Sequence, residues 1–223
     1  MLLKEHTIGG IHDFLDPILK RYALRGGRAI DLGAGSGALA VRLRELGFEV
    51  IAVDINSERF KANIPFVQLN LNNPDFSSLG DREFDFVTAV EVIEHLESPI
   101  TFLRHIGSLL KPDGVALITT PNMDNAPSRF RFLLTGKLHM MDEKVPNHIS
   151  PIFHDLFIRQ YLPRAGLKLV EHHFFPKNGY KVSRKYYSWF LRLLARLLPG
   201  NTLFGDVHVF VLKVIDDKYG KES

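Results

Sequence analysis

The chain has 223 residues, of which 45% are hydrophobic and 24% charged, and this is enough for one globular domain with a full core. It contains no cysteine, which excludes disulfides and thiolate metal sites, and its net charge of +3 is too small to indicate nucleic-acid binding. The first ten residues hold no long apolar segment, and no stretch approaches the roughly 20 apolar residues of a membrane span, so we expect a cytoplasmic protein.

The first half of the chain alternates amphipathic and apolar segments. Helices are predicted over residues 11–25, with a break or bend near Pro17, over 36–47, and over 99–114, where a Pro-Asp-Gly turn ends the helix. Strands are predicted at 28–33, 49–55, 65–70, 84–90 and 115–121. This alternation is typical of a parallel sheet with helices on both faces.

The alternation ends at Pro121. Residues 122–150 mix Pro, Gly, Met and basic residues, and we predict an inserted lid at the carboxyl edge of the sheet, to which the N-terminal helical segment 1–27 also contributes. A helix over 150–166, a strand over 167–176 and an amphipathic helix over 182–199 are expected next. The last strand, around 206–214, is predicted as a hairpin partner at an edge of the sheet.

The segment AIDLGAGSGALA, residues 29–40, places Gly33, Gly35 and Gly37 between a strand and a helix. Backbone N–H groups at such a position bind ligands, and with Ala38 the spacing also fits the G-x-G-x-x-G/A dinucleotide pattern. Asp31 argues against a dinucleotide, because an acid beside a pyrophosphate is repelled, whereas it suits a ligand with a positive end. No tyrosine is followed by lysine four residues later, so the proton donor of a small reductase is also missing.

Four segments in order, AIDLGAGSG, VIAVDI, FDFVTAVEVIEHL and LLKPDGVALITTPN, resemble the motifs of class I S-adenosylmethionine-dependent methyltransferases. Within that superfamily, EVIEH followed by residues 145–171 is most similar to the ubiquinone-biosynthesis type O-methyltransferases. The resemblance implies a single Rossmann-like α/β domain with a seven-stranded mixed sheet and an antiparallel last strand. It also implies methyl transfer from S-adenosylmethionine, with S-adenosylhomocysteine as the product.

The resemblance assigns ten positions to the cofactor. They are Asp31, Gly33, Ala34, Gly35, Gly37, Asp54, Ile55, Asn70, Val90 and Glu91. Asp31 and the glycine loop would face the methionine part, Asp54 the ribose hydroxyls, and Ile55 the adenine. Asn70 stands where the family usually has an acid, and its amide oxygen can accept the same hydrogen bond from the adenine amine. Val90 and Glu91 would border the sulfonium and the acceptor.

Catalytic candidates follow the fourth predicted strand. Glu91, Glu94 and His95 are spaced to project from one side of a helical turn, and some relatives are thought to bind a divalent metal there. A metal is not favoured, because hard ions usually take more carboxylates than this set provides. Transfer to a hydroxyl needs a base near its proton, and the candidates are His95 and His148.

Two basic and apolar segments, 128–141 and 182–198, are candidates for contact with a membrane surface or a hydrophobic substrate, although packing on the core or on a second subunit explains them equally. The predicted function is methyl transfer to a small hydrophobic acceptor, with oxygen as the expected target, by a monomer or homodimer. The alternatives are a non-catalytic subunit with the same fold and a reductase that binds NAD through the glycine loop.

Overall fold

The computed structural model describes residues 3–5, 7–23, 26–73, 75–76, 79, 84–141, 143, 145–182, 193 and 203–215. Seven strands form its sheet: β1 Gly27–Leu32, β2 Phe48–Asp54, β3 Phe66–Gln68, β4 Phe84–Val90, β5 Leu110–Pro121, β6 Leu167–Phe175 and β7 Val207–Val214. The helical elements are α1 Ile11–Ala23, α2 Ala38–Glu45, η2 Ile93–His95, α3 Pro99–Leu109, α4 Ala126–Thr135, α5 His154–Leu156, η3 Phe157–Tyr161 and α6 Leu162–Arg164. Among the described residues, none of these helices combines the length and apolar character that crossing a bilayer requires.

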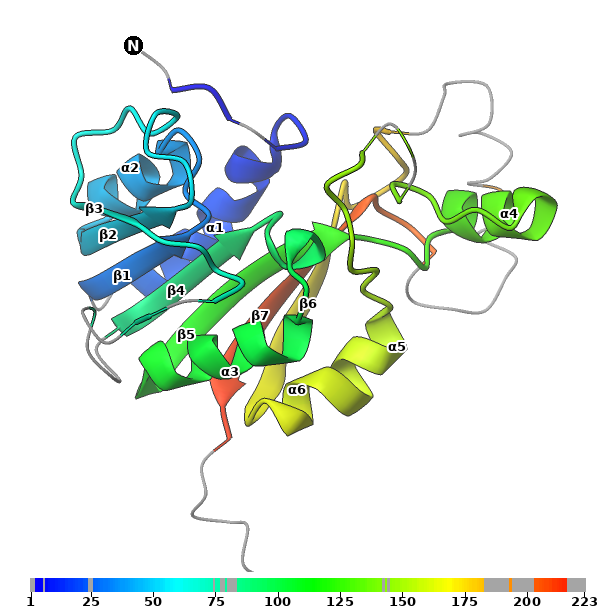
Figure 1. The fold of residues 1–223 in the computed structure, drawn as a ribbon. Coiled ribbons are helices and arrows are strands. Elements are labelled where there is room, and N and C mark those ends of the chain that lie inside the picture. Colours follow the sequence, from blue (N-terminus) through cyan, green and yellow to red (C-terminus); the bar gives the residue numbers. More distant parts are fainter. Residues whose placement is uncertain are drawn as a thin grey trace, which may run out of the picture.

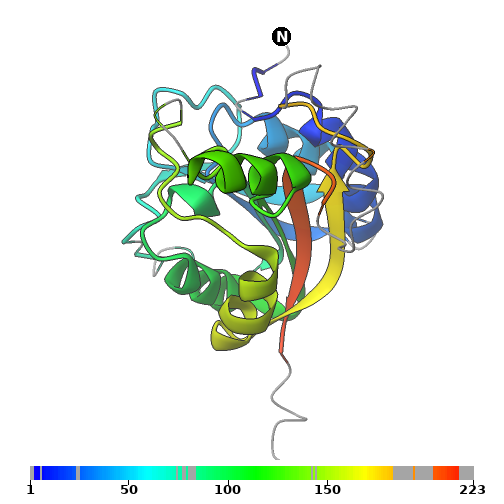
Figure 2. The ribbon, with the colours of Figure 1, turned by 90° about the vertical axis from the view of Figure 1, so that its right-hand side faces the viewer.

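The strand order is β3-β2-β1-β4-β5-β7-β6, and β7 runs antiparallel to both of its neighbours. The predicted seven-stranded mixed sheet with an antiparallel last strand is therefore confirmed. The prediction that this strand lies at an edge is wrong, because β7 is inserted between β5 and β6 (Figure 2). The physical reason is visible in its burial: residues 207–212 are buried on both faces, as a central strand requires, whereas most of β6 is partly exposed.

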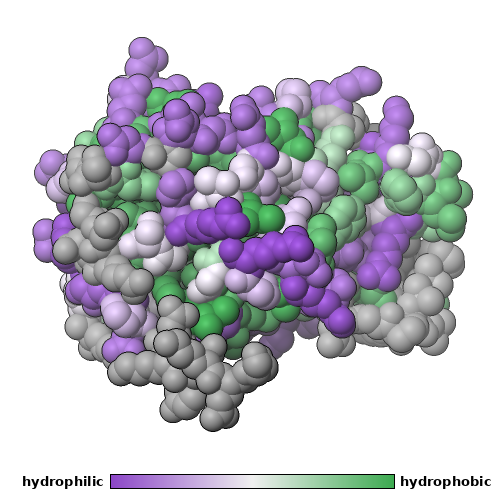
Figure 3. Space-filling view, turned by 60° about the horizontal axis from the view of Figure 1, so that its bottom comes forward, coloured by the Kyte–Doolittle hydropathy of each residue, from purple (hydrophilic) through white to green (hydrophobic). Residues whose placement is uncertain are grey.

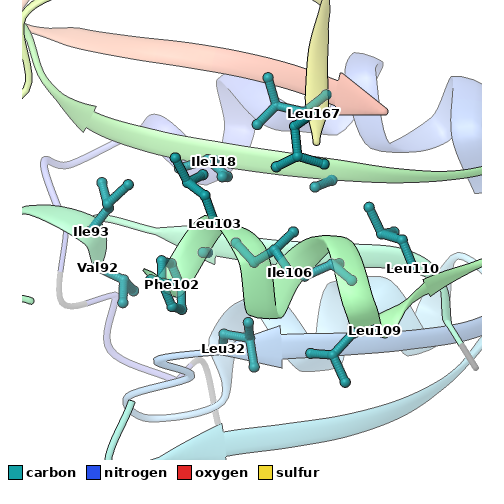
Figure 4. Close-up of a cluster of buried hydrophobic side chains, with 14 of the residues drawn as sticks. Leu32, Val92, Ile93, Phe102, Leu103, Ile106, Leu109, Leu110, Ile118 and Leu167 are labelled. Carbon is teal, nitrogen blue, oxygen red and sulfur yellow. The ribbon is translucent and has the colours of Figure 1, made fainter. Parts of the chain in front are cut away.

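Helices cover both faces of the sheet (Figure 1). α1 and α2 pack on one face, where Leu15, Leu43 and Val209 belong to the same buried cluster. On the other face, α3 directs Leu103 and Ile106 toward the sheet (Figure 4), and the same cluster extends to η3 and α6. Full burial of one such side chain contributes about 1.5–3 kcal/mol, so these two layers hold the strand ends in fixed positions.

Several predicted boundaries shift. α1 continues through Pro17 to Ala23 without a break, and α3 ends at Leu109, five residues before the predicted helix end at Gly114. The Pro-Asp-Gly segment instead lies within β5, where the pairing with β4 changes register between Phe84 and Phe86. The predicted helix over 182–199 lies largely outside the described residues.

The predicted lid, residues 122–150, contains α4 and a returning loop. α4 stands apart from the sheet and its covering helices (Figure 1). Phe132, Leu133 and Leu134 on α4 are exposed, and hydrophobic side chains also gather at the corresponding end of the surface in Figure 3. The returning loop is tied to the sheet, because the backbone N–H groups of Ile149 and Ser150 donate to the carbonyl oxygen of Glu94.

Candidate functional site

The glycine loop connects β1 to α2 with a backbone that other residues would strain. Gly33 and Gly37 have φ angles of 76° and 87°. A Cβ at Gly33 would meet Val92 at 2.4 Å, and one at Gly37 would meet Ala62 at 2.5 Å. The loop therefore needs glycine at both ends for the same two reasons, positive φ and close packing.

Asp54 at the end of β2 is fixed against this loop. Its Oδ2 accepts a hydrogen bond from the Gly35 N–H at 2.8 Å, and its Oδ1 accepts one from the Asn56 N–H at 2.8 Å. Each carboxylate oxygen keeps a further lone pair for a ligand hydroxyl. Asn56, and not Asp54, caps the next turn, since its side chain accepts hydrogen bonds from the N–H groups of Glu58 and Arg59.

A cavity of about 380 Å³ opens beside the loop, at the carboxyl ends of β1, β2 and β4. It is lined by nine of the ten predicted cofactor positions: Asp31, Gly33, Ala34, Gly35, Asp54, Ile55, Asn70, Val90 and Glu91. Gly37 does not line the cavity. Its left-handed backbone conformation instead sets how the loop enters α2. The carboxyl edge of such a sheet is where α/β proteins generally bind ligands.

Asp31 supplies the test of whether this cavity suits S-adenosylmethionine. Its side chain is 2% exposed; the Thr88 hydroxyl donates to Oδ1 at 2.7 Å, and Oδ2 has no hydrogen-bond partner. Burial raises the pKa of Asp31 to about 7. Asp31 lines the cavity, and a buried carboxylate with an oxygen that has no hydrogen-bond partner favours a cationic partner, so the residues present fit the ammonium of the cofactor.

The other end of the cavity suits an adenosine. Ile55 is 60% exposed and lines the cavity, which leaves its side chain free to cover a planar base. Asn70 lines it too, and its Oδ1 already accepts a hydrogen bond from the Asn72 N–H. An oxygen with two lone pairs can still accept a second hydrogen bond from an amine.

Glu91 begins the catalytic side of the cavity, directly after β4. It holds a positive φ of 57°, which is rare for a residue with a side chain and is often found at functional sites. The Thr119 hydroxyl accepts the Glu91 N–H at 3.0 Å and donates to its Oε1 at 3.1 Å. Burial raises the pKa of this carboxyl to about 7, and burial together with the charge of Glu91 also raises the pKa of Glu94.

Both candidate bases have a defined tautomer when neutral. His95 Nδ1 lies 2.8 Å from the carbonyl oxygen of Asn147, and His148 Nδ1 lies 2.8 Å from that of Met140. A carbonyl only accepts, so each Nδ1 carries the proton and each Nε2 keeps the lone pair of a base. His95 lines the cavity and His148 does not. Burial, and then the charge of His95, lower the pKa of His148.

The structure changes the predicted metal set. One ligand atom each from Glu94, His95 and His148 lie within 4.8 Å of one another, so these three residues could hold an ion. Glu91, which the sequence placed in the set, is instead hydrogen-bonded to Thr119. His148 comes from a loop more than 50 residues away, so its addition could not be predicted from local spacing.

Sequence reasoning also missed three lining residues from the N-terminal segment, Glu5, Thr7 and His12. We expected this segment to form part of an acceptor lid, yet it lines the same cavity as Asp31 and the glycine loop. Residues 3–12 contain no ligand-binding motif that could have indicated this position.

Comparison with known proteins agrees with this geometry. The sequence profile of a family described as "Methyltransferase domain" matches residues 3–172. A ubiquinone biosynthesis O-methyltransferase of Xanthomonas campestris pv. campestris strain B100 is 32% identical over 167 residues, which cover 70% of this chain and 69% of that protein.

Solved structures share the fold at lower identity. One is a SAM-dependent methyltransferase from Archaeoglobus fulgidus, with a TM-score of 0.59 and 21% identity, covering 91% of this chain and 94% of that one. Another is the Burkholderia thailandensis 1,6-didemethyltoxoflavin-N1-methyltransferase, solved with 1,6-didemethyltoxoflavin and S-adenosylhomocysteine bound. Its TM-score is 0.59 at 19% identity, covering 92% of this chain and 78% of that one.

Proposed function

The chain belongs to the S-adenosylmethionine-dependent methyltransferases, and from this premise we propose that it methylates a hydroxyl oxygen of a small hydrophobic acceptor. The observation that carries the choice of oxygen is His95, whose Nε2 lone pair is available in the cavity that Glu91 borders. Methyl transfer to a hydroxyl releases a proton, and a positioned imidazole is the usual group to accept it. The ubiquinone biosynthesis relatives, which are O-methyltransferases by name, support the same choice.

We assign the ten cofactor positions to the donor as the family resemblance implies. Asp31 would hold the ammonium, Asp54 the ribose hydroxyls, and the backbone of the glycine loop would lie against the methionine part. Bound there, S-adenosylmethionine would supply a methyl group on a sulfonium, and attack by the acceptor oxygen in line with the breaking C–S bond would release S-adenosylhomocysteine. The task of the protein is then to align the acceptor and to exclude water.

The hydrophobic character of the acceptor rests on the cavity wall and the lid. Leu71, Val92 and Leu96 line the cavity, and Asn147 brings the lid 122–150 to the same wall beside His95. We propose that this part of the lid covers the acceptor, within the single methyltransferase domain formed by the chain.

A pair of matched acceptors tests the proposal. We would incubate the protein and S-adenosylmethionine with a catechol that carries a short prenyl tail, and with the 2-aminophenol of the same skeleton, and locate the new methyl group by mass spectrometry. O-methylation of both is expected. His95→Gln should lower kcat by about 10²–10⁴-fold, since it removes the base, with a smaller change in KM.

His105→Gln, on α3 and outside the cavity lining, is the matched control and should keep the wild-type kcat. Activity is also expected to survive EDTA, because the Glu94, His95 and His148 set contains one carboxyl, whose raised pKa opposes ion binding. Methylation of the amine alone, or an unchanged kcat in His95→Gln, would overturn the assignment.

A further inference from the structure

Two buried threonines on neighbouring strands each bind an acid that lines the cavity. Thr88 on β4 donates to Oδ1 of Asp31 at 2.7 Å, and Thr119 on β5 donates to Oε1 of Glu91 at 3.1 Å. In each pair the threonine comes from the strand beside the one that carries or precedes the acid. Each acid is therefore held by a side chain that does not itself line the cavity.

Thr119 also holds the backbone of Glu91, at the point where β4 ends. Val90 and Thr119 face each other in the ladder between β4 and β5, and directly after this pair the Glu91 N–H donates to the Thr119 hydroxyl at 3.0 Å. Glu91 has a φ of 57°, which is costly for a residue with a Cβ and persists only where the surroundings fix it. One hydroxyl therefore fixes both the strained backbone and the carboxyl of Glu91.

The turn that follows β4 places Glu91 and His95 in the wall of the same cavity. A carboxylate in such a wall can accept a hydrogen bond from the acceptor and so hold the acceptor in line with the sulfonium. Thr119 lies outside the lining, so it can act on a bound ligand only through Glu91. The contact that fixes Glu91 is therefore also a contact that sets the alignment of the acceptor.

We propose that Thr119 is a positioning residue for methyl transfer, which aims the Glu91 carboxyl at the acceptor. The two threonines then have separate tasks, because Thr88 acts on the donor through Asp31 and Thr119 acts on the acceptor through Glu91. The proposal rests on the proposed function, in that the acceptor occupies the side of the cavity bordered by Glu91 and His95. It does not depend on which atom of the acceptor is methylated.

Isosteric valine variants separate the two tasks. We would measure kcat and KM with the prenylated catechol, and the affinity for S-adenosylhomocysteine by calorimetry, in the wild type, Thr88→Val and Thr119→Val. Thr119→Val should lower kcat by about 10–100-fold, because a misplacement of about 1 Å can cost 10²-fold, and should leave the affinity for S-adenosylhomocysteine unchanged. Thr88→Val should instead bind S-adenosylhomocysteine about tenfold more weakly, because Asp31 loses its hydrogen bond.

Further variants show whether Thr119 acts through Glu91. Thr119→Ser keeps the hydroxyl and should restore kcat to within about threefold of the wild type. In the background of Glu91→Ala, Thr119→Val should lower kcat by less than about twofold more, because the group through which it acts is gone. Thr101→Val, on α3 and outside the cavity lining, is the matched control and should keep the wild-type kcat.

Three results would overturn the proposal: a wild-type kcat in Thr119→Val, a loss in that variant confined to the affinity for S-adenosylhomocysteine, or additive losses of kcat in the double variant. Circular dichroism melting checks that each variant is folded, and if Thr119→Val is not, Thr119→Ala takes its place in every measurement. The proposed O-methylation fails on other observations, namely the position of the new methyl group and the kcat of His95→Gln. If the methyl group is found on the amine, the same variants are compared with the 2-aminophenol as acceptor.

Discussion

The ionisation of Asp31 makes binding of the methyl donor depend on pH. Its pKa is about 7 because burial outweighs the hydrogen bond from Thr88. The ionised form is the one that pairs with an ammonium, so below pH 7 a proton must leave before the cofactor binds. Above pH 7 that cost is absent.

We therefore expect the affinity for S-adenosylhomocysteine to fall by up to about tenfold for each pH unit below 7. Asp31→Asn should bind it about 10–100-fold more weakly at pH 8 and with a flatter pH profile. Calorimetry between pH 5.5 and 8 measures both effects. Glu91→Gln is the comparison, because the pKa of Glu91 is also raised to about 7 but its Oε1 already has Thr119 as a partner. A profile in Asp31→Asn as steep as that of the wild type contradicts the argument.

At the scale of the element, α4 carries an exposed apolar surface that its own packing does not explain. Leu133 is 80% exposed and Leu134 is 66% exposed, and Lys137 lies three residues after Leu134. Apolar side chains beside basic ones are typical of segments that lie on anionic bilayers. The other predicted membrane-facing segment, 182–198, lies largely outside the described residues, so α4 is where the proposal of membrane contact can be tested.

The wild type is expected to co-sediment with vesicles of phosphatidylglycerol and phosphatidylcholine, and less with phosphatidylcholine alone. Leu133→Glu with Leu134→Glu should lower the bound fraction at least tenfold, because each leucine loses about 1.5–3 kcal/mol of burial in the lipid. Leu156→Glu on α5 is the control, since Leu156 is also exposed at 41%. Equal sedimentation of the double variant and the wild type would refute membrane contact through α4.

The elements that could be predicted are those determined by local sequence. β4 begins and ends where its apolar run does, and the glycine loop lies between a strand and a helix as its spacing indicates. The position of β7 was not predictable, because the choice between an edge and a central place depends on β6 and on pairing across the chain. The positions of His12 and His148 at the site were unpredictable for the same reason, because tertiary packing places them there and no local sequence pattern indicates it.

At the scale of the whole molecule, a row of histidines joins α5 to the β6–β7 pair. His154 Nε2 lies 3.2 Å from His172 Nδ1, and His172 Nε2 lies 3.0 Å from His208 Nδ1. The central imidazole, His172, donates one of these hydrogen bonds and accepts the other when it is neutral. Burial, and then the charges of neighbouring histidines, lower the pKa of His172 to about 3 and that of His208 well below its ordinary value.

This row makes stability depend on pH in a definite direction. A histidine whose pKa is lowered by folding binds its proton more readily in the unfolded chain, so its stabilising contribution is lost as pH falls below 6.5. The raised pKa values of Asp31 and Glu91 act in the opposite direction, because those carboxyls bind protons more readily in the folded chain. The slope of the wild type combines these opposing contributions, so the histidine part has to be isolated by substitution.

The variant His172→Gln isolates the contribution of the histidine row to the pH dependence of stability. Between pH 6.5 and 5 the wild type should lose about 1–2 kcal/mol of unfolding free energy relative to this variant, since one shifted group contributes up to about 1.4 kcal/mol per pH unit and partial solvent exposure reduces that figure. Urea unfolding followed by circular dichroism at the two pH values measures the difference. His105→Gln should follow the wild type more closely, because its imidazole on α3 is outside the row and its pKa is lowered by burial alone. If the free-energy difference between His172→Gln and the wild type stays constant with pH, the three imidazoles pack together without linking folding to protonation.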